Sequence, residues 1–130
     1  MANLFKYTVK TPSFEPMVRI TSTKNAEHYQ WGDHCDGWHL LKSDTLSVIR
    51  ERMPPGAGEK KHYHNKAQQL FFILAGQAAF DIDGEIYHLK SGESIHIPPG
   101  AVHCVVNNSG EDLEFLLVSE PKAHGDRVDL

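Results

Sequence analysis

The sequence predicts an all-β protein folded as a sandwich or a barrel. Its strand-like segments are short and are separated by clusters of Gly, Pro, Asn and Asp, a pattern typical of such folds. The dipeptide Asp83-Gly84 lies between two of these segments and suits a two-residue hairpin turn, in which both central residues need positive φ. No segment keeps a 3.6-residue apolar period over several turns, so helix is a minor component.

Turn residues set the limits of the expected strands. The strand-like alternation of residues that begins at Leu46 must end at Pro54-Pro55, because proline cannot donate a hydrogen bond to a neighbouring strand. Pro98-Pro99-Gly100 interrupts a later strand in the same way. The expected strands are 46–53, 70–74, 78–82, 85–89, 94–97, 101–106 and 113–118, with weaker candidates at 17–21 and 38–41 and an irregular or helical stretch at 27–36.

Length and composition favour one domain over residues 1–130. The chain is 40% hydrophobic, enough for a single core, and its formal net charge is −4. The longest basic block is Lys60-Lys61, so we expect no nucleic-acid partner. No apolar run approaches the roughly 18 residues of a membrane span, and 1–9 lacks a signal-peptide pattern. We therefore expect a cytoplasmic protein with no membrane partner, in which Cys35 and Cys104 are reduced.

Two histidines one residue apart, His62 and His64, carry the clearest chemical signal. Side chains alternate along a β-strand, so both imidazoles point to one face and can bind one ion. Neutral imidazole is a common ligand for zinc, copper, iron and nickel. A third histidine on another strand, His103, would complete a metal site with open positions.

Two sets of spaced residues surround these histidines. They are Gly56, His62, His64, Gln69 and Gly76, then Gly92, Pro98, Gly100, His103 and Asn107. The spacings resemble the two signatures of the cupin superfamily, with Gln69 where the first signature usually has Glu. The resemblance implies a double-stranded β-helix, or jelly-roll barrel, with its motif core at 56–107. It also implies that His62, His64, Gln69 and His103 bind a metal, and that the protein is a homodimer with N-terminal strands from 1–45 exchanged.

The alternation of a strand selects between two adjacent glutamines. Gln68 and Gln69 must face opposite ways, and the interval to Gly76 favours Gln69 as the inward residue, although a β-bulge would reverse the choice. Phe71 and Ile73 then share the inward face with Gln69 and line the pocket. A buried amide that only satisfies a backbone group is the alternative. As a neutral ligand, Gln69 leaves the full dipositive charge in the pocket but cannot act as a base.

Three further residues are candidates for the substrate pocket. Trp38 is an apolar candidate, with core packing as its alternative role. Arg50 could clamp a substrate carboxylate if its strand face is inward, although exposed arginines are more common. His96 lies two residues before Pro98 on a strand that leads toward His103. The polar segment 119–130 either covers the barrel mouth, packs on a partner or is a disordered tail.

The sequence leaves several functions open. The first is a metal-dependent dioxygenase acting on a small oxygen-rich or anionic compound, as the cupin resemblance implies. The alternatives are a non-catalytic small-molecule binding or sensing protein and a redox-neutral isomerase or lyase, for which no base stands out. The cofactor is one divalent transition metal, and iron, manganese, nickel, cobalt and zinc all suit imidazole ligands.

Overall fold

A computed structural model describes residues 18–130, which form strands, turns and loops but no helix. This part of the chain has no helix long and apolar enough to cross a bilayer. The strands are β1 (Glu27–Trp31), β2 (Cys35–Lys42), β3 (Ser47–Met53), β4 (His62–His64), β5 (Gln68–Ala75), β6 (Gln77–Ile82), β7 (Glu85–Lys90), β8 (Ser94–Ile97), β9 (His103–Val106), β10 (Leu113–Glu120) and β11 (Arg127–Asp129).

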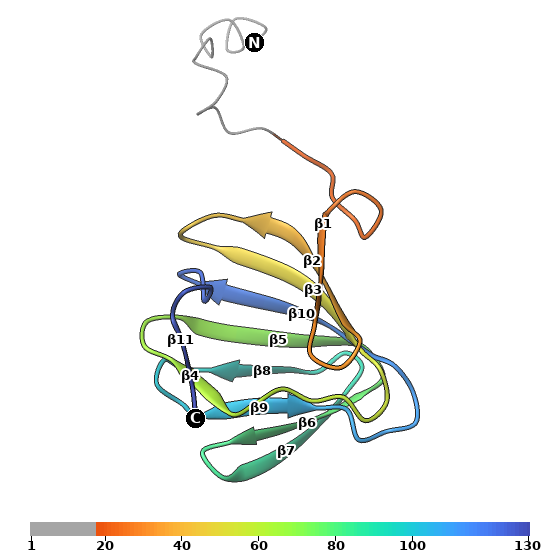
Figure 1. The fold of residues 1–130 in the computed structure, drawn as a ribbon, viewed down its shortest axis with the longest axis vertical. Helices are drawn as coiled ribbons and strands as arrows, with labels where there is room; N and C mark the ends of the chain where they lie inside the picture. Colours follow the sequence, from red (N-terminus) through yellow and green to blue (C-terminus); the bar gives the residue numbers. More distant parts are fainter. Residues whose placement is uncertain (1–17) are drawn as a thin grey trace, which may run out of the picture.

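The strands form two antiparallel sheets that close a jelly-roll barrel, which confirms the predicted fold class. The larger sheet has the order β1-β2-β3-β10-β5-β8, and the smaller has the order β11-β4-β9-β6-β7. In Figure 1 the larger sheet occupies the upper part of the barrel, and β9, β6 and β7 lie below it. Several neighbouring strands come from distant parts of the chain, such as β10 beside β5 and β9 beside β4, so the motif residues of β4 and β9 meet only in the folded barrel.

The strongly patterned segments form the predicted strands, and Asp83-Gly84 makes the predicted hairpin with φ of 50° and 90°. The expectation for 27–36 is wrong, because this stretch contains β1, a turn and the start of β2. β1 is a mostly exposed edge strand held by its pairing to β2, so its sequence carries little apolar pattern. The weak strand candidate at 17–21 is also wrong for its described residues, which form no strand.

The predicted exchange of N-terminal strands between protomers is not tested by this structure. Residues 1–17 lie outside the described part of the chain. β1 and β2 pair with each other, and β2 pairs with β3 of the same chain. The homodimer therefore stays a prediction.

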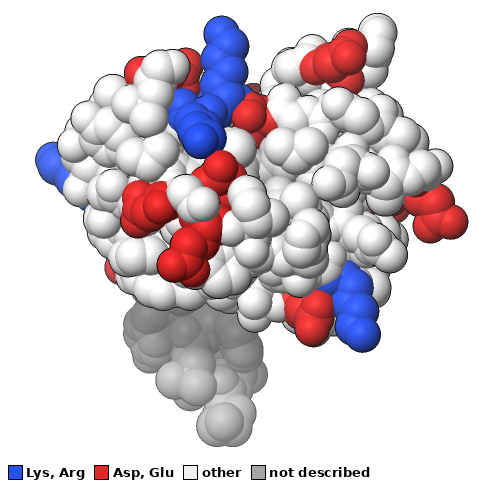
Figure 2. All heavy atoms as spheres, turned by 90° about the horizontal axis from the view of Figure 1, so that it is seen from below, with Lys and Arg blue, Asp and Glu red and all other residues white. Residues whose placement is uncertain are grey.

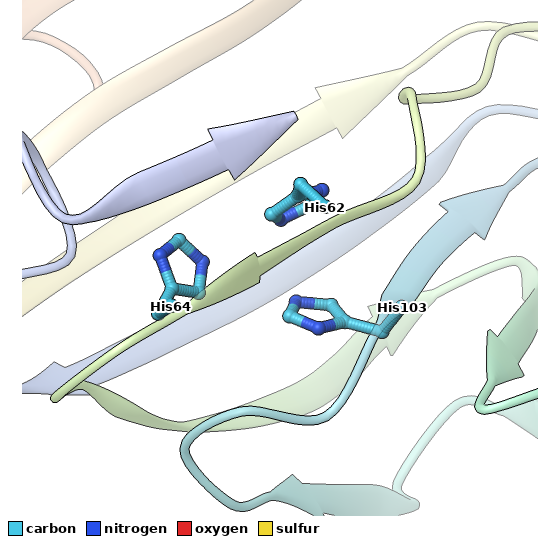
Figure 3. A group of neighbouring side chains, drawn as sticks. All are labelled: His62, His64 and His103. Atoms are coloured by element: carbon cyan, nitrogen blue, oxygen red, sulfur yellow. The ribbon is translucent and has the colours of Figure 1, made fainter. Parts of the chain in front are cut away.

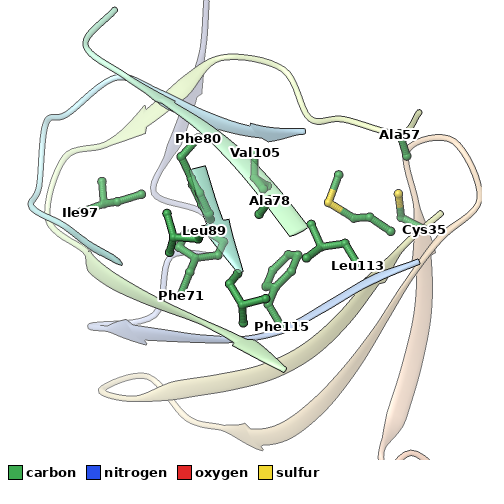
Figure 4. Close-up of a cluster of buried hydrophobic side chains, with 12 residues drawn as sticks. Cys35, Ala57, Phe71, Ala78, Phe80, Leu89, Ile97, Val105, Leu113 and Phe115 are labelled. Atoms are coloured by element: carbon green, nitrogen blue, oxygen red, sulfur yellow. The ribbon is translucent and has the colours of Figure 1, made fainter. Parts of the chain in front are cut away.

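Aromatic side chains from both sheets fill the closed end of the barrel (Figure 4). The ring of Phe71 lies 5.0 Å from that of Phe80 and 5.3 Å from that of Phe115, measured between centroids. All three are almost fully buried, and each contributes on the order of 1.5–3 kcal/mol through the removal of apolar surface from water. This packed end leaves the other end of the barrel free for polar residues.

Two motif residues have structural roles at the closed end. The buried Asn107 amide donates to the carbonyl oxygens of Met53 at 2.9 Å and Glu111 at 2.7 Å, so it joins the end of β3 to the loop before β10. Gly76 has a φ of +81°, and a Cβ at this position would collide with the backbone of Asp112. The two residues hold the loops that set the register of β5 against β10.

Candidate metal centre

Three buried histidines converge inside the barrel (Figure 3). His62 and His64 both project inward from β4, as two-residue alternation requires, and His103 begins β9 directly opposite His62. One ligand atom from each ring lies within 4.8 Å of the others, so the three residues could hold a metal ion. The ring centroids are 4.4 to 5.6 Å apart.

Backbone carbonyl groups fix the orientation of all three rings. Nδ1 lies 2.7 Å from the Lys60 oxygen in His62, 3.0 Å from the Asp126 oxygen in His64 and 2.9 Å from the Ala101 oxygen in His103. A carbonyl oxygen can only accept, so each Nδ1 carries the proton and each Nε2 keeps its lone pair. This is the arrangement in which outer hydrogen bonds orient histidine ligands for a metal.

The protonation state of the rings suits metal binding. Burial lowers the pKa of all three, against the opposing effect of the carbonyl contacts, and the pKa of His62 falls to about 4. The imidazoles are therefore neutral at physiological pH. Nε2 of His64 is buried and has no hydrogen-bond partner among the described residues. An ion at the centre would satisfy this lone pair, so the donor set fits a divalent transition metal.

The side chain of Gln69 reaches the same centre from β5. Its amide is buried and lies 3.1 Å from Nε2 of His103 and 3.1 Å from the Ser119 hydroxyl. In the structure the amide oxygen faces Nε2 of His103 and the amide NH2 donates to the Ser119 hydroxyl. A half-turn of the amide would instead direct its NH2 to the His103 lone pair when no ion is bound. Gln68 points outward, where it contacts His96 and Glu120. Metal ligation by Gln69 stays a prediction, but its inward orientation is the one that ligation requires.

The C-terminal segment is part of this centre. β11 pairs with β4, and Arg127 lies opposite His64. The Asp126 carboxylate accepts hydrogen bonds from the backbone N–H groups of residues 65–67 at 2.9 to 3.1 Å, and these contacts lower its pKa. Residues 126–129 are thus neither irregular nor a free tail. β11 could hardly be predicted from the sequence, because three residues are too few to show a repeating apolar pattern.

A cavity of about 890 Å³ opens beside the triad. Its wall includes His62, His64, Gln69 and Phe71. Four buried side-chain nitrogens have no partner among the described residues, and three of them belong to cavity residues: Trp31 Nε1, His39 Nδ1 and His64 Nε2. Buried polar atoms are normally satisfied. These atoms are available to hydrogen-bond with water or with a polar ligand in the cavity.

Two acidic side chains in the cavity wall were missed by the sequence interpretation, which found no base. Glu51 projects inward from β3, and Glu59 lies just before β4. Burial is the main cause that raises the pKa of Glu51 to about 8 and that of Glu59 to about 7. Glu51 was identifiable in principle, because it shares a strand face with the apolar Ile49 and Met53. His39 lines the cavity as well.

The structure corrects three of the predicted pocket residues, which do not line the cavity. Trp38 lies on the outer face of β2, where its ring packs 5.3 Å from that of His28. Arg50 points outward from β3 and contacts Glu114 at 2.9 Å. His96 lies on the exposed face of β8 beside Gln68. Side chains alternate along a strand, and each of these three residues is an odd number of positions from the inward-facing residues of its strand, so its side chain points outward. Of the motif-strand candidates, Phe71 lines the cavity, whereas Ile73 lies deeper in the apolar core.

Residues 49–119 match the cupin domain family. The chain belongs to this family. The match begins in β3 and ends in β10, so it includes the three histidines, Gln69 and Glu51, and it leaves out β1, β2 and β11.

Similar proteins support the same assignment. An oxalate-binding protein of Thermotoga maritima is 29% identical over 85 residues, which cover 62% of this cupin and 70% of that protein. A mannose-1-phosphate guanylyltransferase of Salmonella typhimurium is 35% identical over 104 residues, which cover 77% of this chain but only 22% of the relative. A crystal structure of an RmlC-like cupin from Shewanella frigidimarina superposes with a TM-score of 0.75 at 19% identity, covering 84% and 96% of the two chains. The last comparison concerns the fold alone.

Proposed function

We propose that this cupin is a metal-dependent enzyme that holds a small, oxygen-rich, anionic compound beside the three histidines. The observation that carries the proposal is the convergence of three Nε2 lone pairs, one of them buried without a partner. His62, His64 and His103 would hold the ion, and Gln69 would be a fourth, neutral ligand. When bound, the ion would act as a Lewis acid toward a ligand oxygen.

The charges of the cavity support an anionic ligand. All four proposed ligands are neutral, so the ion would keep its two positive charges. Arg127 lines the cavity from β11, opposite His64, and Lys42 and Lys122 lie at its rim. The rim lysines are paired with Glu27 and Asp44, whereas Arg127 points toward Glu59 at 3.9 Å. The outer surface shown in Figure 2 is mostly uncharged, with small separate groups of acidic and basic side chains.

Two reaction classes fit this centre. A dioxygenase would need two open positions at the metal, one for a chelating substrate and one for O₂, and a three-histidine set can leave them open. A redox-neutral isomerase or lyase needs a group that moves a proton, and Glu51 and Glu59 supply such groups in the same cavity. The buried carboxyl groups favour the redox-neutral class. A protein that binds its ligand without turnover is the remaining alternative, and it would use the same cavity.

Elemental analysis of the purified protein tests the metal site. We expect about one divalent transition metal per chain in the wild type and a large loss in His64→Ala. His96→Ala is the matched control, because His96 lies on the outer face, and its metal content should equal that of the wild type. Equal metal in all three proteins would refute the site.

Oxygen uptake then separates the two reaction classes. Ferrous-loaded protein is mixed with catechols, diketones and flavonols, and O₂ consumption is followed. Consumption that depends on His64 would establish the dioxygenase. Oxalate binding by the metal-loaded protein, measured by calorimetry, tests the anionic ligand class, since the Thermotoga relative is named for that dicarboxylate.

A further inference from the structure

Glu51 and Glu59 enter the cavity from opposite sheets. Glu51 lies in the middle of β3, paired with Gly37 on one side and Phe115 on the other. Glu59 precedes β4 in the smaller sheet, and its backbone N–H donates to the Val105 oxygen at 3.0 Å. Glu51 is 7% exposed and the Glu59 side chain 12%. Two carboxyl groups that line the cavity are therefore withdrawn from water.

The surroundings of the pair offer little compensation for two negative charges. Tyr29 and the indole of Trp31 lie beside the Glu51 carboxyl group, and the Val105 N–H donates to Glu59 at 3.2 Å. The nearest cation is Arg127, whose Nη1 lies 3.9 Å from Glu59, while its Nε is committed to Asp129 at 2.6 Å. Ionisation of both carboxyl groups would leave buried negative charge largely unpaired, which is costly.

The pair should therefore retain a proton near neutral pH. Burial raises the pKa of Glu51 to about 8, with the charge of Glu59 as the second cause, and burial raises the pKa of Glu59 to about 7. Two interacting carboxyl groups titrate as a unit with values that belong to the pair. The other titratable or charged groups that act on them from neighbouring elements are Tyr29, Cys35, Cys104, Arg127 and Asp129.

Glu59 lies close to the three histidines, because both contact neighbouring positions of β9. Glu59 contacts β9 at Val105, and His62 pairs with β9 at His103. Val105 and His103 are two residues apart, so their side chains share a face and their positions are about 7 Å apart along the strand. A ligand of a few carbon atoms held at the triad would extend over that distance.

We propose that Glu51 and Glu59 form an acid–base pair that moves a proton on a small 2-oxo or hydroxy-carbonyl acid in the cavity. The ionised member takes a proton from the carbon next to the carbonyl group. The C–H electron pair forms a C=C bond and the π electrons of the carbonyl group move to its oxygen, which gives an enolate. The pair then returns a proton to carbon or oxygen, which gives back the ligand or its isomer. This proton transfer needs no oxidant. The inference rests on the proposed function, because the ligand is held at the three histidines.

Hydrogen exchange into pyruvate measures this proton transfer. Zinc-loaded protein is incubated with pyruvate in D₂O, and loss of the methyl ¹H signal is followed by NMR. We expect catalysed exchange in the wild type, and in Glu51→Gln and Glu59→Gln a loss of about 100-fold or more, the usual contribution of a positioned acid or base. Glu114→Gln is the matched control, because Glu114 points outward from β10 toward Arg50, and its exchange rate should be unchanged.

A second measurement is independent of metal and ligand. The carboxyl carbons of metal-free protein are titrated by ¹³C NMR, and we expect two groups near neutral pH in the wild type and one in each cavity variant. The inference is overturned if both glutamate carboxyl groups titrate near pH 4.5. It is also overturned if hydrogen exchange into pyruvate is equally fast in the wild type, Glu51→Gln and Glu59→Gln. A wild type that binds no zinc but keeps the raised titration refutes the proposed metal function instead.

Discussion

The backbone oxygen of Asp126 accepts a hydrogen bond from Nδ1 of His64 at 3.0 Å, across 62 positions of the chain. The Asp126 carboxylate meanwhile binds the backbone N–H groups of the loop between β4 and β5. One residue thus orients a metal-site histidine and fixes the loop that follows it. The candidate metal site thus has contacts with a segment that the cupin family match does not include.

Asp126→Ala should weaken metal binding while His62, His64 and His103 remain intact. Loss of the loop contacts would loosen β11 and the ring of His64, and loss of such outer support typically costs about 10- to 100-fold in metal affinity. Zinc competition with a chromophoric chelator measures the change. Asp33→Ala is a suitable control, since the Asp33 side chain is 84% exposed. An unchanged zinc affinity in Asp126→Ala would show that β11 is dispensable for the site.

Gln69→Glu should tighten divalent metal binding by about tenfold or more, equivalent to roughly 1.4 kcal/mol. A carboxylate brings a negative charge to a site whose other proposed ligands are neutral. Gln68→Glu places the same charge on the outer face of β5 and should leave the zinc affinity unchanged. The chelator competition assay compares both variants with the wild type. A tighter Gln68→Glu protein would contradict the proposed role of Gln69.

The stability of the metal-free protein should decrease between about pH 4.5 and 8 because of Glu51 and Glu59. Their pKa values are raised to about 8 and about 7, mainly by burial, so the folded state binds more protons than the unfolded state in this window. The free energy of unfolding then falls as pH rises. The three histidines have the opposite effect on stability at lower pH. Burial lowers their pKa values, so the folded state binds fewer protons than the unfolded state and the free energy of unfolding rises with pH.

Urea unfolding at several pH values isolates the carboxyl contribution. In Glu51→Gln the decrease between pH 6 and 8 should be smaller than in the wild type, whereas Glu114→Gln should follow the wild-type curve. Identical pH dependence in all three proteins would mean that Glu51 titrates normally.

Gly37→Ala should destabilise the protein by roughly 1–3 kcal/mol, the usual effect of overpacking. A Cβ at residue 37 would collide with the ring of Tyr29, which crosses this position on its way to Glu51. Urea unfolding measures the loss. Gly110→Ala meets no atom within 4 Å and requires no left-handed backbone, so it controls for the added methyl group. Equal stability of the two variants would show that the Tyr29 ring moves aside freely.

The sequence was informative where a period or a fixed spacing applied. The two-residue repeat placed His62 and His64 on one face, and the same rule turned Gln69 inward. Prediction from the sequence failed where the location of a side chain depends on tertiary contacts. Arg50 drew attention as a charged candidate, yet the apolar Ile49 and Met53 set the inward face of β3 and brought Glu51 into the cavity instead.

No local sequence pattern predicts the position of Glu59 in the cavity or the strand β11. Glu59 is placed by contacts with Val105, 46 residues away, and lies outside any strand. β11 exists because its backbone pairs with β4, and its sequence of Arg, Val and Asp has no pattern of its own. Pairings of such long range are set by the whole barrel.

If the three histidines bind a metal as proposed, the position of Asp126 also bears on when that site can form during translation. His62, His64 and Gln69 leave the ribosome more than fifty residues before Asp126 does. Until residues 126–129 dock, His64 lacks the carbonyl that orients its ring, and the loop after β4 lacks its carboxylate. A nascent chain would therefore bind an ion only loosely, and metal loading would follow the completion of folding.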